Sequence, residues 1–165
     1  MKKHPEIRPI LAKDDQEICR IIKSVGQEYG AVGEGFGPSD PEVEAMSQHY
    51  GKDGVSMYLV VAMDQHIVGG CGIAPFQGSQ EICELRKLFL LPECRGLGIG
   101  KLLTNECLAL AHQHGFKQCY LDTLKSMTSA ISLYEKIGFR HLSSPLDGTI
   151  HGGCDVWMLI ELDND

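Results

Sequence analysis

The sequence lacks the long apolar run that a membrane-spanning helix needs. No stretch reaches the roughly eighteen consecutive apolar residues typical of such a helix, and the basic start Met1–Pro5 is not followed by an apolar signal segment. We therefore expect no membrane partner.

Cysteine pairing is also missing. The seven cysteines are an odd number, and no Cys-x-x-Cys pair occurs among them. Four lie inside apolar patterns, as small core residues do: Cys71, Cys83, Cys107 and Cys119. A reducing compartment fits this usage, so we expect a cytoplasmic protein.

A histidine cluster of the metal-binding kind is not evident. His112 and His114 are two residues apart on an expected helix and cannot share one ligand face. His151-Gly152-Gly153-Cys154 is better interpreted as a flexible hairpin turn than as a nucleophile or metal motif. We therefore expect the seven histidines to lie mainly at the surface, and we predict no metal.

Positive charge is scarce, since the formal net charge is −7, and this argues against a nucleic-acid partner. The charge is uneven. Residues 84–140 hold eight Lys/Arg and five Asp/Glu, a balance of +3, and the remainder holds seven and seventeen, a balance of −10. The positive part suits an anionic ligand and the acidic part a cationic amine, although chance placement of solvated charges explains the acidic part equally well.

The length of 165 residues predicts a single domain over 1–165. Apolar periodicity and turn residues predict a mixed α/β architecture in which the early strands are antiparallel. A crossover helix between the strands near residues 88 and 119 requires these two strands to be parallel. The expected strands are 7–10, 57–63, 67–74, 82–91, 118–121, 139–142 and 156–162. The expected helices begin near Asp15, at Pro41, near Ile99 and after a cap at Ser126 or Thr128, with Gly138 ending the last.

A glycine-rich turn at 95–101, Arg-Gly-Leu-Gly-Ile-Gly-Lys, links an expected strand to an expected helix. Unpaired N–H groups at a helix start and flanking cations favour an anion, and glycine lets a backbone approach a ligand closely. A Walker loop would need Ser or Thr after Lys101, where the chain has Leu102. A dinucleotide fingerprint needs a different glycine spacing. We interpret the turn as a pyrophosphate cradle, against the alternative of a purely structural turn.

Two further segments accompany this turn. Residues 130–139 match the pattern Ala-x-x-Leu-Tyr-x-Lys-x-Gly-Phe, and residues 84–90, within the expected strand 82–91, carry a glutamate at Glu84. With these three segments the chain resembles the GNAT N-acetyltransferase superfamily. The resemblance implies a central mixed sheet of six to seven strands flanked by about four helices. It also implies acetyl-CoA as co-substrate. Met127 departs from the family, which often has asparagine there.

The resemblance also implies roles for individual residues. Tyr134 would be the general acid that faces the sulfur and Glu84 the general base; Asp122 or water are rivals of Glu84 for that role. The alternatives are a core aromatic for Tyr134, a pairing with Arg86 for Glu84 and a turn cap for Asp122. The family's acceptor pocket would be walled by residues 29–50 and 143–154. The cofactor residues would be Leu88, Phe89, Leu90, Arg95, Gly96, Leu97, Gly98, Ile99, Gly100 and Lys101.

The function implied is an N-acetyltransferase that moves an acetyl group directly from acetyl-CoA to a primary amine of a small molecule or amino acid. A protein N-terminus or lysine is the alternative acceptor. A non-catalytic acyl-CoA-binding or sensor module is the alternative function. A kinase or dehydrogenase is disfavoured by the loop. Because many members of the superfamily form dimers, a homodimer stays open.

Overall fold

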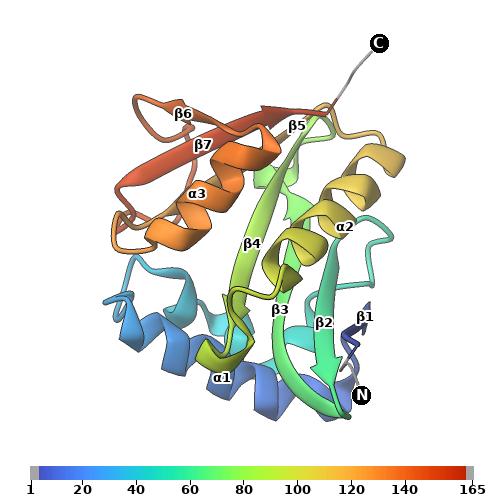
Figure 1. The fold of residues 1–165 in the computed structure, drawn as a ribbon. Coiled ribbons are helices and arrows are strands. Elements are labelled where there is room, and N and C mark those ends of the chain that lie inside the picture. The colour runs from blue at the N-terminus through green and yellow to red at the C-terminus, as the bar shows by residue number, and fades with distance from the viewer. Residues whose placement is uncertain (1–3, 163–165) are drawn as a thin grey trace.

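The computed structural model describes residues 4–162. Seven strands form one mixed sheet in the order β1-β2-β3-β4-β5-β7-β6 (Figure 1). The strands are β1 (Glu6–Pro9), β2 (Met57–Met63), β3 (His66–Pro75), β4 (Ile82–Leu90), β5 (Gln118–Thr123), β6 (Arg140–Leu142) and β7 (Val156–Glu161). All neighbours are antiparallel except β4 and β5. The predicted mixed sheet and its parallel pair are confirmed.

Three α-helices and several 3-10 segments flank the sheet: α1 (Asp15–Glu28), α2 (Ile99–Gln113), α3 (Thr128–Ile137), η1 (Ala12–Asp14), η2 (Gly37–Ser39), η3 (Pro41–Gln48), η4 (Phe76–Gly78) and η5 (Pro92–Cys94). The helix expected from Pro41 is the 3-10 segment η3, interrupted at Ala45, whose backbone is not helical. Among the described residues, no helix is long and apolar enough to span a membrane.

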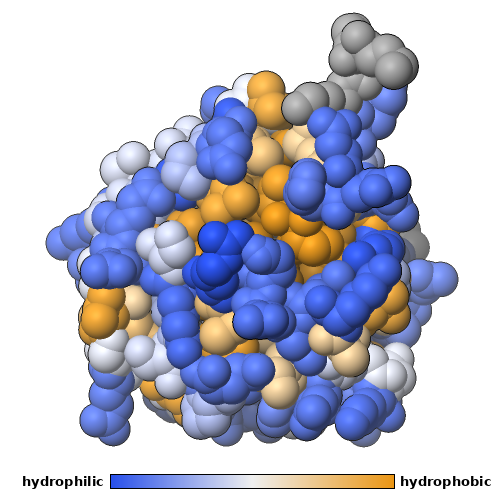
Figure 2. Space-filling view, turned by 90° about the horizontal axis from the view of Figure 1, so that it is seen from below, coloured by the Kyte–Doolittle hydropathy of each residue, from blue (hydrophilic) through white to orange (hydrophobic). Residues whose placement is uncertain are grey.

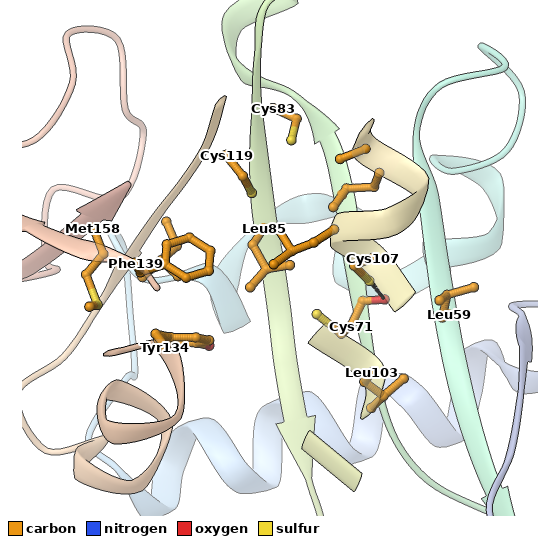
Figure 3. Packing of buried hydrophobic residues seen from close by; sticks show 14 of the residues in the cluster. Leu59, Cys71, Cys83, Leu85, Leu103, Cys107, Cys119, Tyr134, Phe139 and Met158 are labelled. Carbon is orange, nitrogen blue, oxygen red and sulfur yellow. Dashed lines mark hydrogen bonds between the residues drawn. The ribbon is translucent and has the colours of Figure 1, made fainter. Parts of the chain in front are cut away.

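Alternating residues of β2 divide the core into two layers. Tyr58 and Val60 pack with Ile18 and Ile22 of α1, whereas Leu59 and Val61 belong to the cluster that includes Leu103 of α2. Because successive side chains of a strand point to opposite faces, α1 and α2 cover opposite faces of the sheet. The four cysteines expected in the core are fully buried and free. Figure 3 shows them beside Leu85 and Leu103.

Two local expectations are corrected. The β2–β3 turn is the two-residue Asp64–Gln65 with positive φ at both, not a three-residue loop. Neither Ser126 nor Thr128 caps α3: Met127 occupies the cap position without a side-chain hydrogen bond, and the Ser126 hydroxyl donates to the Tyr29 carbonyl instead.

The parallel strands β4 and β5 separate soon after they begin. They pair at three positions, Ile82 to Glu84, and among the described residues β4 beyond Glu84 pairs only with β3. Figure 1 shows the two strands diverging below this point. The separation exposes the edge of β4 that leads to the glycine-rich turn.

A β-bulge lies in the exposed part of β4. Gly70 faces Phe89 and Gly72 faces Arg86, so two residues of β4 oppose Cys71 alone. Lys87 in the bulge has φ 52°, a left-handed conformation. The Tyr58 hydroxyl donates to the Lys87 carbonyl at 2.8 Å and so supports the bulge from the neighbouring face.

Candidate functional site

A groove of about 730 Å³ runs from the separated part of β4 to the glycine-rich turn. Its walls come from β4, the turn, the C-terminal half of α1 and α3. Eight of the ten predicted cofactor residues line it: Leu88, Phe89, Leu90, Arg95, Gly96, Gly98, Gly100 and Lys101. Figure 2 views the molecule from below Figure 1, the side where α1 lies, and shows hydrophobic residues gathered in a hollow that hydrophilic side chains surround.

The turn has the geometry that a phosphate cradle requires. Gly96 and Gly98 have φ of 77° and 81°, which side-chain-bearing residues rarely adopt. A Cβ on Gly100 would lie 3.3 Å from the Leu133 side chain of α3, so a larger residue there would crowd this wall of the groove. Gly98 is the N-cap of α2, and the amides of the first turn of α2 are available to an anion.

Two predicted cofactor residues do not line the groove. Ile99 is buried in the core against the sheet, so only its main chain can contribute. The Leu97 side chain is 62% exposed and lies outside the lining.

Arg95 lines the groove and also forms hydrogen bonds with other residues of the protein. Its guanidinium donates to both carboxylate oxygens of Glu28 in α1, at 2.6 and 2.8 Å, and to the Leu90 carbonyl. It also lies over the Tyr29 ring, 5.3 Å from the centroid. The sequence pattern suggested a cation free for pyrophosphate, whereas the structure makes Glu28 a competitor for it.

A smaller inner chamber of about 80 Å³ adjoins the groove. The two cavities share Leu88, Phe89 and Met127 in their linings. The chamber is also lined by Glu84, Tyr134, residues 36–38 and the loop between β6 and β7. The structure thus brings Glu84 and Tyr134 to one cavity, and it brings both segments expected to wall an acceptor pocket to the same place.

Glu84 is buried, with 5% of its surface exposed. Its Oε1 accepts a hydrogen bond from Arg86 Nε at 2.7 Å, so the pairing considered as an alternative to a base role does exist. Burial raises the pKa of Glu84, and the neighbouring Asp122 carboxylate adds to this, against the opposing Arg86 and His151 cations. A carboxyl with a raised pKa is a better proton acceptor at neutral pH.

Tyr134 lies on α3 and is buried. Its ring packs against Phe139 with the centroids 5.6 Å apart, so the core-aromatic alternative is part of its role. Figure 3 shows its hydroxyl end directed toward β4. Burial raises the pKa of the Tyr134 phenol well above its ordinary value, which keeps the hydroxyl protonated.

His151 is where the sequence interpretation is wrong. Only 7% of His151 is exposed, so it is buried and does not lie at the surface. Hydrogen bonds also hold its loop against other segments of the site. Its Nδ1 lies 2.9 Å from Asp122 Oδ1 and its Nε2 lies 2.8 Å from Asp40 Oδ2. Asp122 therefore does not cap the turn after β5; it faces His151 and accepts a hydrogen bond from Thr149 at 2.6 Å.

Further charges complete a largely buried cluster that we call the charged cluster: Asp40, Glu42, Glu84, Arg86, Lys87, Asp122 and His151. The Lys87 ammonium, with only 3% of its side chain exposed, lies 2.8 Å from Asp40 and 3.4 Å from Glu42. Arg86 links Glu84 to Glu42, and the Tyr50 hydroxyl also donates to Glu42. Even with His151 protonated, four carboxylates face three cations.

Glu84, Asp122 and His151 each offer an atom of the kind that binds metals, all within 4.8 Å of one another. Each already has a protein partner, in Arg86, Thr149 and Asp40 respectively. That no metal is required stays a prediction.

Comparison with known proteins gives the family. A sequence model described as the acetyltransferase (GNAT) family matches residues 8–139. The chain is 41% identical over 160 residues to the uncharacterized N-acetyltransferase YjgM of Escherichia coli K12, covering 96% of this chain and 95% of that protein. This chain belongs to the GNAT acetyltransferase family.

Solved structures show the same fold for this GNAT acetyltransferase. A GNAT acetyltransferase from Staphylococcus aureus Mu50 aligns with a TM-score of 0.80 at 20% identity, covering 97% of this chain and all of that chain. The yncA acetyltransferase from Salmonella typhimurium, solved with its cofactor acetyl-CoA, aligns with a TM-score of 0.78 at 16% identity, covering 98% and 96%. The resemblance seen in the sequence is therefore confirmed, and the protein is an acyltransferase.

The sequence predicted the groove of this acetyltransferase but gave no role in the site to Lys87 and His151 of the charged cluster. Lys87 sits inside a strand pattern and His151 lies in a loop, so local periodicity carries no sign of them. One signal was present. Gly152 and Gly153 follow His151 directly, and a Cβ on Gly153 would lie 2.5 Å from the Phe36 ring, so Gly153 serves close packing rather than flexibility alone.

Proposed function

We propose that this protein transfers an acetyl group from acetyl-CoA directly to the primary amine of a small molecule or amino acid. Acetyl-CoA would lie in the groove, with its pyrophosphate at residues 95–101 and its pantetheine arm along Leu88–Leu90. The acceptor amine would enter the inner chamber. The observation that carries this proposal is the continuity of the two cavities at Leu88, Phe89 and Met127, where β4 and β5 separate.

The dimensions of the cavities support this assignment. The groove of about 730 Å³ is large enough for an extended cofactor, whereas the chamber of about 80 Å³ suits a small acceptor group. The exposed edge of β4 offers backbone groups to which an amide-containing arm can bind, as an added strand would.

The charged cluster supports an ammonium-bearing acceptor. With Glu84 ionised, four carboxylates and at most three cations leave at least one negative charge in a largely buried site. Because an unbalanced buried charge is costly, a substrate ammonium that enters the chamber would be stabilised there.

In the proposed mechanism, acetyl-CoA supplies a thioester that the neutral amine attacks. Glu84 takes a proton from the acceptor ammonium and so generates the neutral amine. The Tyr134 hydroxyl donates its proton to the departing sulfur, and the second proton that the acetylated nitrogen loses restores the Tyr134 phenol. Arg86 holds Glu84 in place through Oε1 and leaves Oε2 facing the interior of the site.

An amine-panel screen tests the proposal. Free thiol and acetylated product are measured with acetyl-CoA and small amines, amino acids, peptides with free N-termini, and lysine peptides. We expect thiol release that depends on a small amine or amino acid. Binding of CoA without release by any amine would favour the acyl-CoA sensor instead, and activity confined to peptides would favour a protein acceptor.

A further inference from the structure

His151 connects three segments that are distant in the sequence. It lies in the loop between β6 and β7 and reaches Asp122 of β5 through Nδ1 and Asp40, the residue before η3, through Nε2. The β6–β7 loop and the loop before η3 are joined by a second hydrogen bond, which the Gly153 amide donates to the Gly35 carbonyl at 2.9 Å. The imidazole therefore closes one wall of the inner chamber.

The geometry of His151 requires its charged form. A carboxylate only accepts hydrogen bonds, and a neutral imidazole has a single N–H, so two carboxylates at hydrogen-bond distance from the two ring nitrogens require an imidazolium. Burial lowers the pKa of His151, but the hydrogen bonds and charges of Asp122 and Asp40 outweigh burial and raise it to about 10. The imidazole is thus protonated at neutral pH.

Glu84 lies within reach of this charge. Its Oε2 is 3.7 Å from His151 Nδ1, whereas Arg86 donates to its other oxygen, Oε1. Glu84 has to be ionised to accept a proton, yet burial and Asp122 favour its neutral form. The groups that face His151 and its partners are Asp40 before η3, Glu42 in η3, Glu84, Arg86 and Lys87 from β4, Tyr120 and Asp122 from β5, and Cys154 from its own loop.

We propose that His151 is a positioning residue: its imidazolium bridges Asp40 and Asp122, fixes the wall of the acceptor chamber and keeps Glu84 in its carboxylate form. This inference rests on the proposed function, in which Glu84 is the base. His151 itself exchanges no proton with the acceptor; it acts through Glu84.

The test compares His151→Gln with His141→Gln. His141 is an exposed histidine that pairs with Glu135 at 3.0 Å, so it is a matched control for loss of an imidazole. Two quantities are followed against pH: kcat/KM with an acceptor amine, and the carboxyl ¹³C shift of Glu84, assigned with Glu84→Gln. For His151→Gln we expect the Glu84 titration to move to higher pH and kcat/KM to fall about tenfold further at the acid end of the profile than at the alkaline end. His141→Gln should behave as wild type.

A second variant separates charge from packing. Asp122→Asn keeps the size of the side chain and removes a carboxylate that raises the pKa of Glu84. It should therefore move the Glu84 titration to lower pH, opposite to His151→Gln. Shifts in the same direction, or an unchanged Glu84 titration in His151→Gln, would overturn the inference.

The carboxyl titration needs no substrate, so it also distinguishes the two proposals. If no amine is acetylated but Glu84 titrates as expected, the proposed function fails and the coupling of His151 to Glu84 stands. If amines are acetylated and Glu84 titrates identically in wild type and His151→Gln, the proposed function stands and the role of His151 is rejected.

Discussion

His151 Nε2 lies 2.8 Å from Asp40 Oδ2, although 111 residues separate the two in the sequence. The contact joins the segment before η3 to the loop between β6 and β7. The same Asp40 oxygen lies 2.8 Å from the Lys87 ammonium of the β4 bulge. One carboxylate therefore ties three sides of the inner chamber together, and its environment predicts how the protein responds to pH.

Stability should fall at alkaline pH because of His151. Its pKa is raised from 6.5 to about 10 in the folded protein, so the stability that it contributes is fully present below pH 6.5 and is lost as pH rises through about 10. Thermal unfolding of wild type and His151→Gln, recorded from pH 6 to 10.5, measures this contribution as a difference. We expect the gap in Tm to close with rising pH. A gap that stays constant across this range would show that His151 is not charged in the folded state.

Tyr134→Phe should lower turnover and leave cofactor binding intact. The change removes only the hydroxyl, and the ring keeps its packing against Phe139. Loss of a general acid typically costs about 100- to 10,000-fold in rate. Steady-state kcat and the calorimetric Kd for CoA are the measurements. Unchanged turnover would remove Tyr134 from the mechanism, and a large loss of CoA affinity would indicate a structural role.

The Arg95–Glu28 pair predicts opposite effects on CoA affinity. Arg95→Gln removes a cation from the phosphate end of the groove and should weaken binding about tenfold, the size expected for a charge-assisted hydrogen bond. Glu28→Gln removes the carboxylate that competes for Arg95 and should tighten binding severalfold. Arg20→Gln is the control, since Arg20 forms an exposed pair with Glu17 on α1. Weaker binding in both Arg95→Gln and Glu28→Gln would mean that the pair acts only as a structural link.

Gly70 in β3 makes room for Tyr58. A Cβ there would lie 2.5 Å from the Tyr58 ring and 2.7 Å from the Leu59 carbonyl, so Gly70→Ala should destabilise the protein by about 1–3 kcal/mol. Gly152→Ala is the matched control, because its Cβ would meet nothing within 4 Å. Chemical denaturation measures both. An equal effect of the two substitutions would mean that Tyr58 and the β4 bulge can move aside.

How much the sequence could predict depends on whether a feature is local. The 95–101 turn was identified because glycine conformation and helix capping act within a few residues, and α3 was identified because residues 130–139 match one continuous sequence pattern. The parallel pairing of β4 with β5 followed from the crossover helix between them. These features position the groove.

The charged cluster could not be predicted, because it forms only when distant segments meet. Asp40 and His151 become partners through the fold, and Lys87 turns inward because the β4 bulge changes the direction of its backbone. Arg95 was interpreted as a free cation since its partner Glu28 is 67 residues away. Pairings of this range leave no periodic pattern in the sequence.

Amine-dependent release of CoA, measured for wild type and Glu84→Gln at saturating acetyl-CoA, tests the central claim most directly. The account predicts release by wild type with a small primary amine, and at least a hundredfold lower kcat/KM for Glu84→Gln while CoA affinity is unchanged. Equal rates for the two proteins, or tight CoA binding without release by any amine, would contradict it.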